Sequence, residues 1–333
     1  MSPTLRTLGR LSLSSSSSSR STACLLARHQ ISSRLYSSQP DAKAIASEFY
    51  SKSQANPPYA QTQLLDANQL QRFSATFSRP ELSKILPKNG TPLPAGYHLA
   101  YFTPAQVEEE LGRDGTDTTF NPPRPYTRRM WAGGELEWVK ENKLRVGQEV
   151  TETTKLISSY SKKSRAGNEM IIVSVEKKFQ NECGVALLDK RNWVFREEIT
   201  KPQAPARRPE EVPFPEGKHV RDFCQTDVTL FRFSAMTFNG HKIHYSKEWC
   251  REVEGHRGLV VHGPLNLINM LNFWRDLQGG DVTPKKITYR ATNPLYASEA
   301  YRIIIGEEVQ KITEVKIVDS YGQVSMQGTI ESF

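Results

Sequence analysis

The sequence predicts an α+β protein built from two similar halves. Strand-like runs with alternating apolar residues and turn signals follow one another directly in each half, which is typical of antiparallel meanders. A Pro-rich segment at residues 201–217 contains five prolines, which exclude a helix or a central strand, and it separates the halves. The segment Gly263–Leu277 is apolar most of the way round, so it predicts a buried helix with the following strands wrapped around it.

In the first half, residues 61–200, one helix precedes a run of strands. A helix is expected over Asp66–Ser78 with Asp66 as its N-cap, because an Asp side chain accepts hydrogen bonds from the first free N–H groups of a helix. Gly96–Phe102 alternates as a strand does, and residues 121–138 are expected to form a Pro-rich loop. The half ends in three strand-like runs at 147–164, 169–180 and 184–197.

The second half, residues 218–333, repeats the mixture of strands around a helix. The expected elements are a strand at 226–238, a motif loop at 239–245, the helix at Gly263–Leu277, and strands within 285–309 and 310–331. A weak internal repeat supports two copies of one plan. Residues 144–157 and 295–308 each place a leucine, a small residue and a glutamate before a strand.

The first 40 residues have the composition of a mitochondrial transit peptide. They contain five arginines and thirteen serines, and the first acidic residue is Asp41. Such a basic, acid-poor leader predicts import into the mitochondrial matrix, removal of residues 1–36, and a polar arm at 37–60. The alternative is a disordered Ser-rich tail with no targeting role.

Charge and cysteine usage argue against several classes of function. The leader arginines account for much of the formal net charge of +8, which leaves about +3 for residues 41–333 and removes the main support for nucleic-acid binding. Of the four cysteines, three remain once the predicted leader is removed: Cys183, Cys224 and Cys250. They are an odd number without C-x-x-C spacing, so neither a disulfide framework nor a zinc ribbon is expected. No apolar run reaches the roughly 18 residues that a membrane helix needs, so no membrane span is expected.

Four of the seven histidines lie between His241 and His262, which marks this window as the candidate site. His244 is expected at a strand end, and His262 and Gly263 open the apolar helix. The first N–H groups of a helix have no intrahelical partner and its dipole is positive at that end, so they can stabilise the enolate oxygen of a thioester. His244 can move protons at the α-carbon and the 3-hydroxyl, as a 3-hydroxyacyl-thioester dehydratase requires.

The neighbouring residues complete the candidate site. Gly263 lets a substrate approach the backbone closely, and Pro264 suits a first helical turn. Asn239 can hold a hydroxyl or a water by its amide but cannot act as a base. The candidates for substrate binding are His241, His262, Pro264 and Tyr245. A zinc site from three of the histidines would need a convergent geometry and usually a carboxylate or a cysteine, so no metal is expected.

Two motifs carry a resemblance to a known family. Asn239-x-His241-x-x-His244, followed by Leu259-Val260-Val261-His262-Gly263-Pro264-Leu265, resembles the hydratase motif of MaoC-like, hot-dog-fold enoyl-thioester hydratases and dehydratases. RRMWAGGELEW at residues 128–138 is similar to one branch, the mitochondrial hydroxyacyl-thioester dehydratases type 2 and their bacterial relatives, including mesaconyl-C4-CoA hydratases. The resemblance covers roughly residues 60–333.

The resemblance implies a double hot dog, in which two antiparallel sheets each wrap around a central helix and the first half carries a degenerate motif. It implies dehydration of (3R)-hydroxyacyl chains to trans-2-enoyl chains on acyl carrier protein or CoA, in mitochondrial type II fatty acid synthesis and without a cofactor. The family's catalytic His falls on His244, its oxyanion glycine on Gly263 and its catalytic Asp on Asn239. Because an amide replaces that acid, we expect His244 alone to shuttle protons, in preference to a scheme in which His241 helps.

Two other functions stay open at this point. One is hydration of a short branched or dicarboxylic enoyl-CoA, which would want an extra cationic residue inside the pocket. The other is a catalytically silent protein that binds acyl chains, because Asn239 replaces the expected acid. Acyl chain length, the choice between CoA and carrier protein, and the choice between a monomer and a homodimer are not determined by the sequence.

Overall fold

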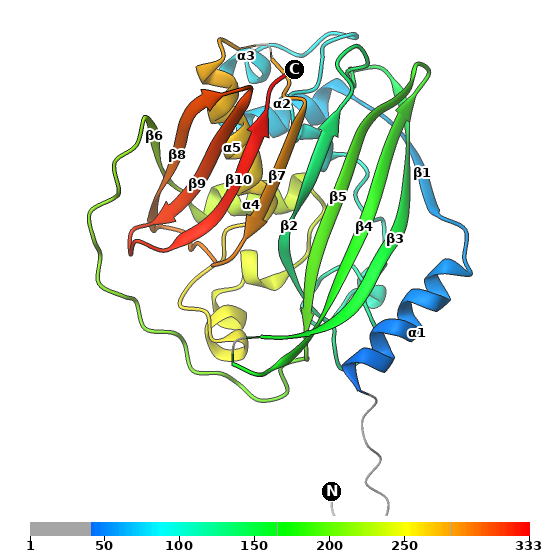
Figure 1. The fold of residues 1–333 in the computed structure, drawn as a ribbon, viewed down its shortest axis with the longest axis vertical. Helices are drawn as coiled ribbons and strands as arrows, with labels where there is room; N and C mark the ends of the chain where they lie inside the picture. The colour runs from blue at the N-terminus through cyan, green and yellow to red at the C-terminus, as the bar shows by residue number, and fades with distance from the viewer. Residues whose placement is uncertain (1–40, 165, 281) are drawn as a thin grey trace, which may run out of the picture. The chain divides into compact units, whose positions relative to one another are not determined.

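Ten antiparallel strands form one continuous sheet in the computed structural model, which describes residues 41–333 except 165 and 281 (Figure 1). The strands are β1 (Tyr59–Leu64), β2 (Arg128–Trp138), β3 (Glu149–Lys163), β4 (Glu169–Asn181), β5 (Gly184–Arg196), β6 (His219–Cys224), β7 (Lys286–Ala291), β8 (Ala300–Val309), β9 (Ile312–Asp319) and β10 (Val324–Glu331). The predicted transit peptide, residues 1–36, lies outside the described residues.

Helices cover one face of this sheet (Figure 1). The α-helices are α1 (Ala42–Gln54), α2 (Ala67–Thr76), α3 (Pro80–Ser83), α4 (Asp227–Met236) and α5 (Gly263–Leu277). Short 3₁₀ segments are η1 (Tyr97–Ala100), η2 (Glu108–Glu110) and η3 (Lys242–His244), and η4 (Trp249–Glu254) is a π-helix. No helix in the described residues is both long and apolar enough to cross a membrane.

The strand order corrects the prediction of two separate sheets. The order is β1-β3-β4-β5-β2-β7-β10-β9-β8-β6, and β2 pairs with β7 from Gly133 opposite Arg290 to Glu137 opposite Lys286. A side chain on Gly133 would collide with the backbone of Tyr289 on the neighbouring strand. The glycine therefore allows the close approach by which the hydrogen-bond ladder continues from one half into the other.

The two halves nevertheless follow one plan. The order β1-β3-β4-β5-β2 in the first half corresponds to β6-β8-β9-β10-β7 in the second, and the predicted repeat at 144–157 and 295–308 leads into the equivalent strands β3 and β8. A stronger repeat lies in α2 and α4, which both contain the sequence Arg-Phe-Ser-Ala. The rings of Phe73 and Phe233 from these repeats lie 5.7 Å apart, so the two helices meet at equivalent positions.

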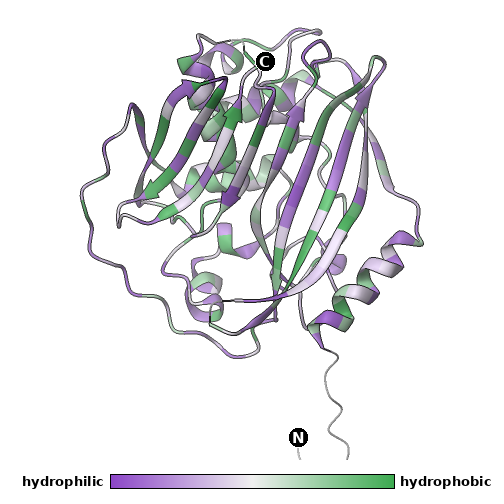
Figure 2. Ribbon diagram, viewed as in Figure 1, coloured by the Kyte–Doolittle hydropathy of each residue, from purple (hydrophilic) through white to green (hydrophobic). Residues whose placement is uncertain are grey.

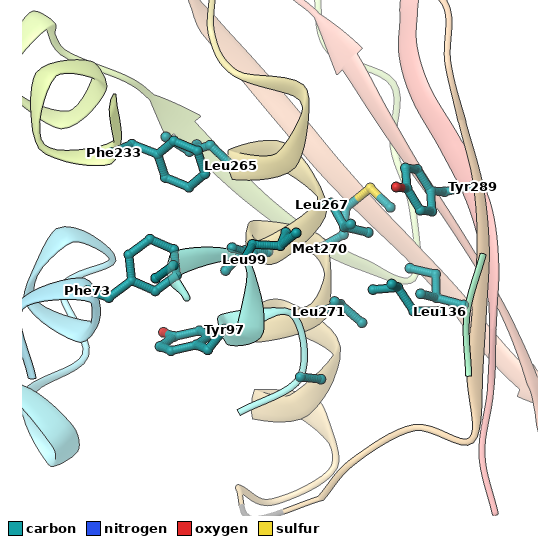
Figure 3. Close-up of a cluster of buried hydrophobic side chains, with 14 of the residues drawn as sticks. Phe73, Tyr97, Leu99, Leu136, Phe233, Leu265, Leu267, Met270, Leu271 and Tyr289 are labelled. Atoms are coloured by element: carbon teal, nitrogen blue, oxygen red, sulfur yellow. The ribbon is translucent and has the colours of Figure 1, made fainter. Parts of the chain in front are cut away.

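Only the second half has the predicted central helix. Helix α5 begins and ends at the predicted residues, and it packs between the sheet and the pair α2 and α4. Figure 3 shows Leu136 and Tyr289 on the sheet side of α5, and Phe73 and Phe233 on the other side. In the first half the described chain between α2 and β2 contains only the four-residue helix α3 and the 3₁₀ segments η1 and η2.

The segment Gly96–Phe102 was predicted as a strand and is instead centred on η1. Gly96 has a φ of 85°, a left-handed conformation that a strand cannot contain. Tyr97, His98, Leu99 and Ala100 are all buried, so neither polar nor apolar positions of the segment face the solvent. The alternation of polar and apolar residues in this segment therefore does not mark a strand with one exposed face. The segment is a turn that is buried on all sides.

Two further predictions were wrong, the strand at 226–238 and the loop at 121–138. Residues 226–238 form α4, in which Leu230 and Phe233 are buried at helical spacing, and the cap is the hydroxyl of Thr226, which accepts from the Thr229 N–H at 3.2 Å. The polar arm, from residue 41 onward, holds α1 and the start of β1. The predicted loop at 121–138 becomes the central strand β2 from Arg128 onward.

The predicted helix at Asp66 and the strand meander are confirmed. The Asp66 carboxylate accepts from the Gln69 N–H at 2.9 Å and caps α2. Strands β3, β4 and β5 pair in sequence order, as do β8, β9 and β10. Figure 2 shows apolar and polar positions alternating along these strands, which places one face of the sheet against the helices. Residues 201–217 contain neither helix nor strand, as predicted.

Candidate active site

His244 lies in η3, not at a strand end, and its ring lines a cavity of about 1830 Å³. The Nδ1 atom is 2.7 Å from the carbonyl oxygen of Val260, so that nitrogen carries the proton and donates. The Val260 N–H in turn donates to the Ile243 carbonyl at 2.9 Å, which ties the two motif segments together. The Nε2 atom makes no hydrogen bond within the described residues and retains its lone pair.

The ring of His262 stacks on that of His244, with the centroids 3.5 Å apart. His262 is fully buried, its Nε2 lies 2.9 Å from the Ser234 hydroxyl, and it is absent from the cavity wall. Its predicted place among the substrate-binding residues is therefore corrected: it packs behind His244. It is the N-cap residue of α5, but its side chain makes no capping bond.

Burial sets the protonation of the stacked pair. It lowers the pKa of His244 to about 3, with the neighbouring His241 as the second cause. It also holds the pKa of His262 well below its usual value. His244 is therefore neutral at physiological pH, with one nitrogen donating to Val260 and the other able to accept a proton.

The N-terminus of α5 lies in the same cavity wall, through Gly263 and Pro264. The Gly263 N–H has no acceptor in the part of the chain that the structure describes. A Cβ at this position would lie 3.0 to 3.2 Å from three atoms of Trp131. The glycine is thus required by the packing of Trp131, in addition to leaving the N–H accessible to a bound molecule.

Asn239, His241 and Tyr245 line the cavity around His244. The Asn239 Oδ1 atom accepts from the backbone N–H of His241 at 3.1 Å, which leaves its Nδ2 as a donor. The Tyr245 hydroxyl donates to the Gly240 carbonyl at 3.1 Å. Asn239 can therefore orient a hydroxyl group by donating to it from Nδ2.

Two carboxylates that sequence reasoning missed face the ring of His241. Its Nε2 lies 3.7 Å from Asp114 Oδ2 and 3.9 Å from Glu254 Oε1. Asp114 comes from the first half and Glu254 from η4, and neither lies in a recognisable motif. No pattern in the sequence could have joined them to the histidine, because the contact depends on how three separate loops pack.

The wall of the cavity contributed by the first half is charged. Trp131 and Arg128 from β2 line it, together with Lys177 and Arg191 from β4 and β5. Lys177 Nζ lies 2.7 Å from Glu152 Oε1, and Arg191 pairs with the buried Asp189. An acyl chain that entered this part of the cavity would meet ion pairs.

No group of three or more histidine, cysteine, aspartate or glutamate side chains arranged to hold a metal ion is found among the described residues. The three histidines that were weighed as a zinc site have other partners. His244 and His262 bond to Val260 and Ser234 and stack flat on each other, while His241 faces carboxylates.

Comparisons with known proteins identify relatives of the chain. A sequence profile for hydroxyacyl-thioester dehydratase type 2 matches residues 96–297. The chain is 29% identical over 247 residues to a mesaconyl-C(4)-CoA hydratase from Chloroflexus aurantiacus, covering 74% of this chain and 85% of the relative. It is 25% identical over 242 residues to a mitochondrial hydroxyacyl-thioester dehydratase type 2 from Schizosaccharomyces pombe, covering 65% and 79%.

Solved structures show the same fold. A MaoC-like dehydratase from Phytophthora capsici superposes with a TM-score of 0.62 and 16% identity, over 85% of this chain and 98% of its own. A Mycobacterium tuberculosis protein described as a double hot dog gives a TM-score of 0.53 and 12% identity, over 84% and 97%. The profile covers more than half of the sequence, and the chain therefore belongs to the hydroxyacyl-thioester dehydratase type 2 family, a family of hydro-lyases.

Proposed function

We propose that this protein dehydrates (3R)-hydroxyacyl thioesters to trans-2-enoyl thioesters. The observation that carries the proposal is the neutral His244, with a free Nε2, in the same cavity wall as the unpaired N–H of Gly263. A base and an anion-stabilising helix terminus are the two parts that an elimination next to a thioester needs.

In this scheme His244 Nε2 removes the proton at C2 of the acyl chain. The Gly263 N–H and the positive end of the α5 dipole stabilise the negative charge that develops on the thioester oxygen. Asn239 Nδ2 donates to the 3-hydroxyl and orients it. The C2–H electron pair forms the double bond as the C3–O bond breaks, and His244 passes the proton it has taken to the leaving oxygen, which departs as water. Pro264 and Tyr245 line the cavity beside these groups and contact the substrate.

The substrate is carried as a thioester of acyl carrier protein or CoA, in mitochondrial type II fatty acid synthesis. The basic, Ser-rich leader supports a mitochondrial matrix location, and the Schizosaccharomyces pombe relative is described as mitochondrial. The proposed chemistry uses only protein side chains and backbone, so no cofactor is part of the scheme.

Hydration of crotonyl-CoA, the reverse reaction, tests the proposal through the loss of enoyl absorbance. We expect turnover by the purified protein, and a fall of at least about 100-fold in His244→Ala because general base catalysis is lost. His219→Ala is the matched control, since this histidine lies on β6 outside the cavity wall. Failure to turn over short or medium chains, on CoA and on carrier protein, would instead support a silent acyl-binding protein.

A second candidate is hydration of a dicarboxylic enoyl-CoA. It is favoured by the buried cations Lys177 and Arg191 in the cavity wall and by the similarity to the mesaconyl-C(4)-CoA hydratase. Either cation could attract a carboxylate at the far end of a short acyl chain.

A comparison of kcat/KM for mesaconyl-C4-CoA and crotonyl-CoA separates the two candidates. The double variant Lys177→Met with Glu152→Met removes an ion pair without leaving one charge buried alone. If the second candidate is correct, kcat/KM for the dicarboxylic substrate exceeds that for crotonyl-CoA and falls at least about tenfold in the double variant. A preference for crotonyl-CoA that the variant does not change would reject it.

A further inference from the structure

His241 is a buried histidine whose surroundings the scheme above does not use. Its side chain is largely enclosed, and Nε2 has no hydrogen-bond partner within bonding distance in the described residues. That atom instead faces two carboxylates, Asp114 at 3.7 Å and Glu254 at 3.9 Å. A buried polar atom without a hydrogen bond costs free energy of folding, because its lost hydration is not replaced. Such an atom therefore calls for an explanation, and a catalytic role is one.

Glu254 is held rigidly in its place. Its Oε1 accepts from the indole N–H of Trp249 at 2.9 Å, and its Oε2 accepts from Arg128 Nε at 2.8 Å. Burial alone would raise the pKa of the Glu254 carboxyl, but His241, Arg128 and Trp249 together lower it to about 2. It is therefore ionised, and it ends a π-helical turn, a feature that occurs frequently at functional sites.

Asp114 is fixed in a similar way from the opposite side. Its Oδ1 accepts from the backbone N–H and the hydroxyl of Thr116, at 3.0 and 2.7 Å, which leaves Oδ2 facing His241. The Asp114 carbonyl also accepts from the Lys242 N–H at 2.8 Å, so this loop of the first half is bound to the motif loop. Asp114 Oδ2 and Glu254 Oε1 are thus both held facing Nε2 of the enclosed ring.

The rest of the His241 ring faces the reaction cavity. It lies edge-on to His244, with centroids 5.3 Å apart and an angle of 82° between the planes. Both rings line the same cavity, and His241 Nδ1 makes no hydrogen bond to any described residue. Each of the two cavity-lining histidines therefore has one ring nitrogen without a hydrogen-bond partner or a facing carboxylate in the described residues, Nε2 in His244 and Nδ1 in His241.

We infer that His241 is a second catalytic residue, the general acid that protonates the departing 3-hydroxyl, and that Glu254 and Asp114 are its positioning residues. This inference rests on the proposed function. His241 supplies the acid that Asn239 cannot provide. With this role for His241, we no longer expect His244 to shuttle protons alone.

The proton balance is as follows in the dehydration direction. His244 Nε2 takes the proton from C2, the electron pair forms the C2–C3 double bond, and the C3–O bond breaks. The leaving oxygen takes the proton of His241 Nδ1 and departs as water. His244 ends protonated and His241 neutral, and exchange with solvent through the open cavity after product release restores both. Hydration follows the same steps in reverse.

A change of leaving group tests this assignment. Fluoride is a much weaker base than hydroxide and departs without a proton, so elimination from (3R)-3-fluorobutyryl-CoA needs the base His244 but not the acid. We expect His241→Gln to lower the rate with (3R)-3-hydroxybutyryl-CoA by about 100-fold or more. With the fluoro substrate the same variant should lose less than about tenfold, whereas His244→Gln should lose activity on both.

His219→Gln is the matched control. This histidine lies on β6 outside the cavity wall, so the substitution replaces a histidine without touching the proposed acid or its two carboxylates. We expect it to keep near wild-type rates on both substrates. Glu254→Gln preserves an acceptor for Trp249 and removes the charge, so it should reproduce the selective loss of the hydroxy substrate, and a purely structural role would lower both rates equally.

The outcomes separate the two levels of the proposal. A wild-type protein without turnover of the hydroxy substrate would reject the proposed function, and this inference with it. The alternative outcome is that the wild-type protein is active while His241→Gln is equally active, or equally impaired, on both substrates. That result would reject the general-acid role alone. Circular dichroism of each variant establishes that it is folded before the rates are compared.

Discussion

The imidazole ring of His262 lies flat against that of His244, with centroids 3.5 Å apart and an angle of 18° between the planes. His262 is the N-cap residue of α5, and its Nε2 is 2.9 Å from the hydroxyl of Ser234 in α4. The ring that supports the proposed base is thus anchored to both helices. This explains how a side chain that no substrate can reach could control the orientation of His244.

Replacement of His262 should therefore lower kcat with little effect on KM. His262→Ala leaves a void behind His244, and we expect a fall in kcat of about tenfold to 100-fold from the loss of base orientation. His262→Phe keeps a flat ring in the stack and should retain more activity than the alanine variant. Steady-state kinetics with crotonyl-CoA provide the measurement. Equal kcat values for the two variants would show that the stack does not position the base.

The folded protein should lose stability as the pH falls from about 6.5 towards 4. Burial lowers the pKa of His244 to about 3 and that of His256 to about 4, and holds that of His262 well below its usual value. Within this window the unfolded chain binds protons that the folded chain does not. The free energy of unfolding should fall by up to about 1.4 kcal/mol per pH unit for each such histidine.

Denaturant unfolding at several values between about pH 7 and 5 measures this slope. The pKa of Glu254 is lowered to about 2, so the stability that this carboxylate contributes is lost only as the pH falls below the ordinary pKa of a glutamate. Glu254 therefore does not contribute to the slope in the upper part of the window. His262→Asn removes one titrating group, so it should reduce the slope of unfolding free energy against pH by up to about 1.4 kcal/mol per pH unit. A stability that does not change above pH 5 would contradict the burial of these rings in neutral form.

Gly263→Ala should impair both stability and turnover. The new methyl group would lie 3.0 to 3.2 Å from Trp131, so the indole or the helix terminus must move. We expect a loss of about 1–3 kcal/mol in the free energy of unfolding, as for other overpacked positions. Gly258→Ala is the control, because a Cβ there meets nothing within 4 Å. Equal free energies of unfolding for the two variants would show that Trp131 can move aside without destabilising the protein.

Asn239→Asp tests the departure from the family pattern. The aspartate keeps an oxygen for the His241 N–H, so the local turn should survive, and it loses the Nδ2 donor. We expect kcat to change by less than about tenfold, because His244 and His241 already provide a base and an acid. A much larger gain would mean that the native site lacks an acid. Full activity of His244→Ala alongside a small effect here would overturn the assignment of the base.

Local signals in the sequence predicted local structure well. The Asp66 cap lies three residues before the N–H that donates to it, and the apolar character of Gly263–Leu277 is a property of that segment alone. Both could therefore be predicted directly from the sequence. The segments 96–102 and 226–238 were misassigned because short apolar alternation does not distinguish a strand from a buried turn or helix. The repeated Arg-Phe-Ser-Ala of α2 and α4 was a signal that could have corrected the second error.

The sequence by itself determined the leader composition, the strand meanders, the buried helix, and the motif residues His244 and Gly263, because each depends on neighbours along the chain. Only the tertiary structure decided that the halves share one sheet through β2 and β7. It alone placed His262 behind His244, and Asp114 and Glu254 against His241. These contacts join segments far apart in the chain, and burial and packing, which no local pattern encodes, determine which of them form.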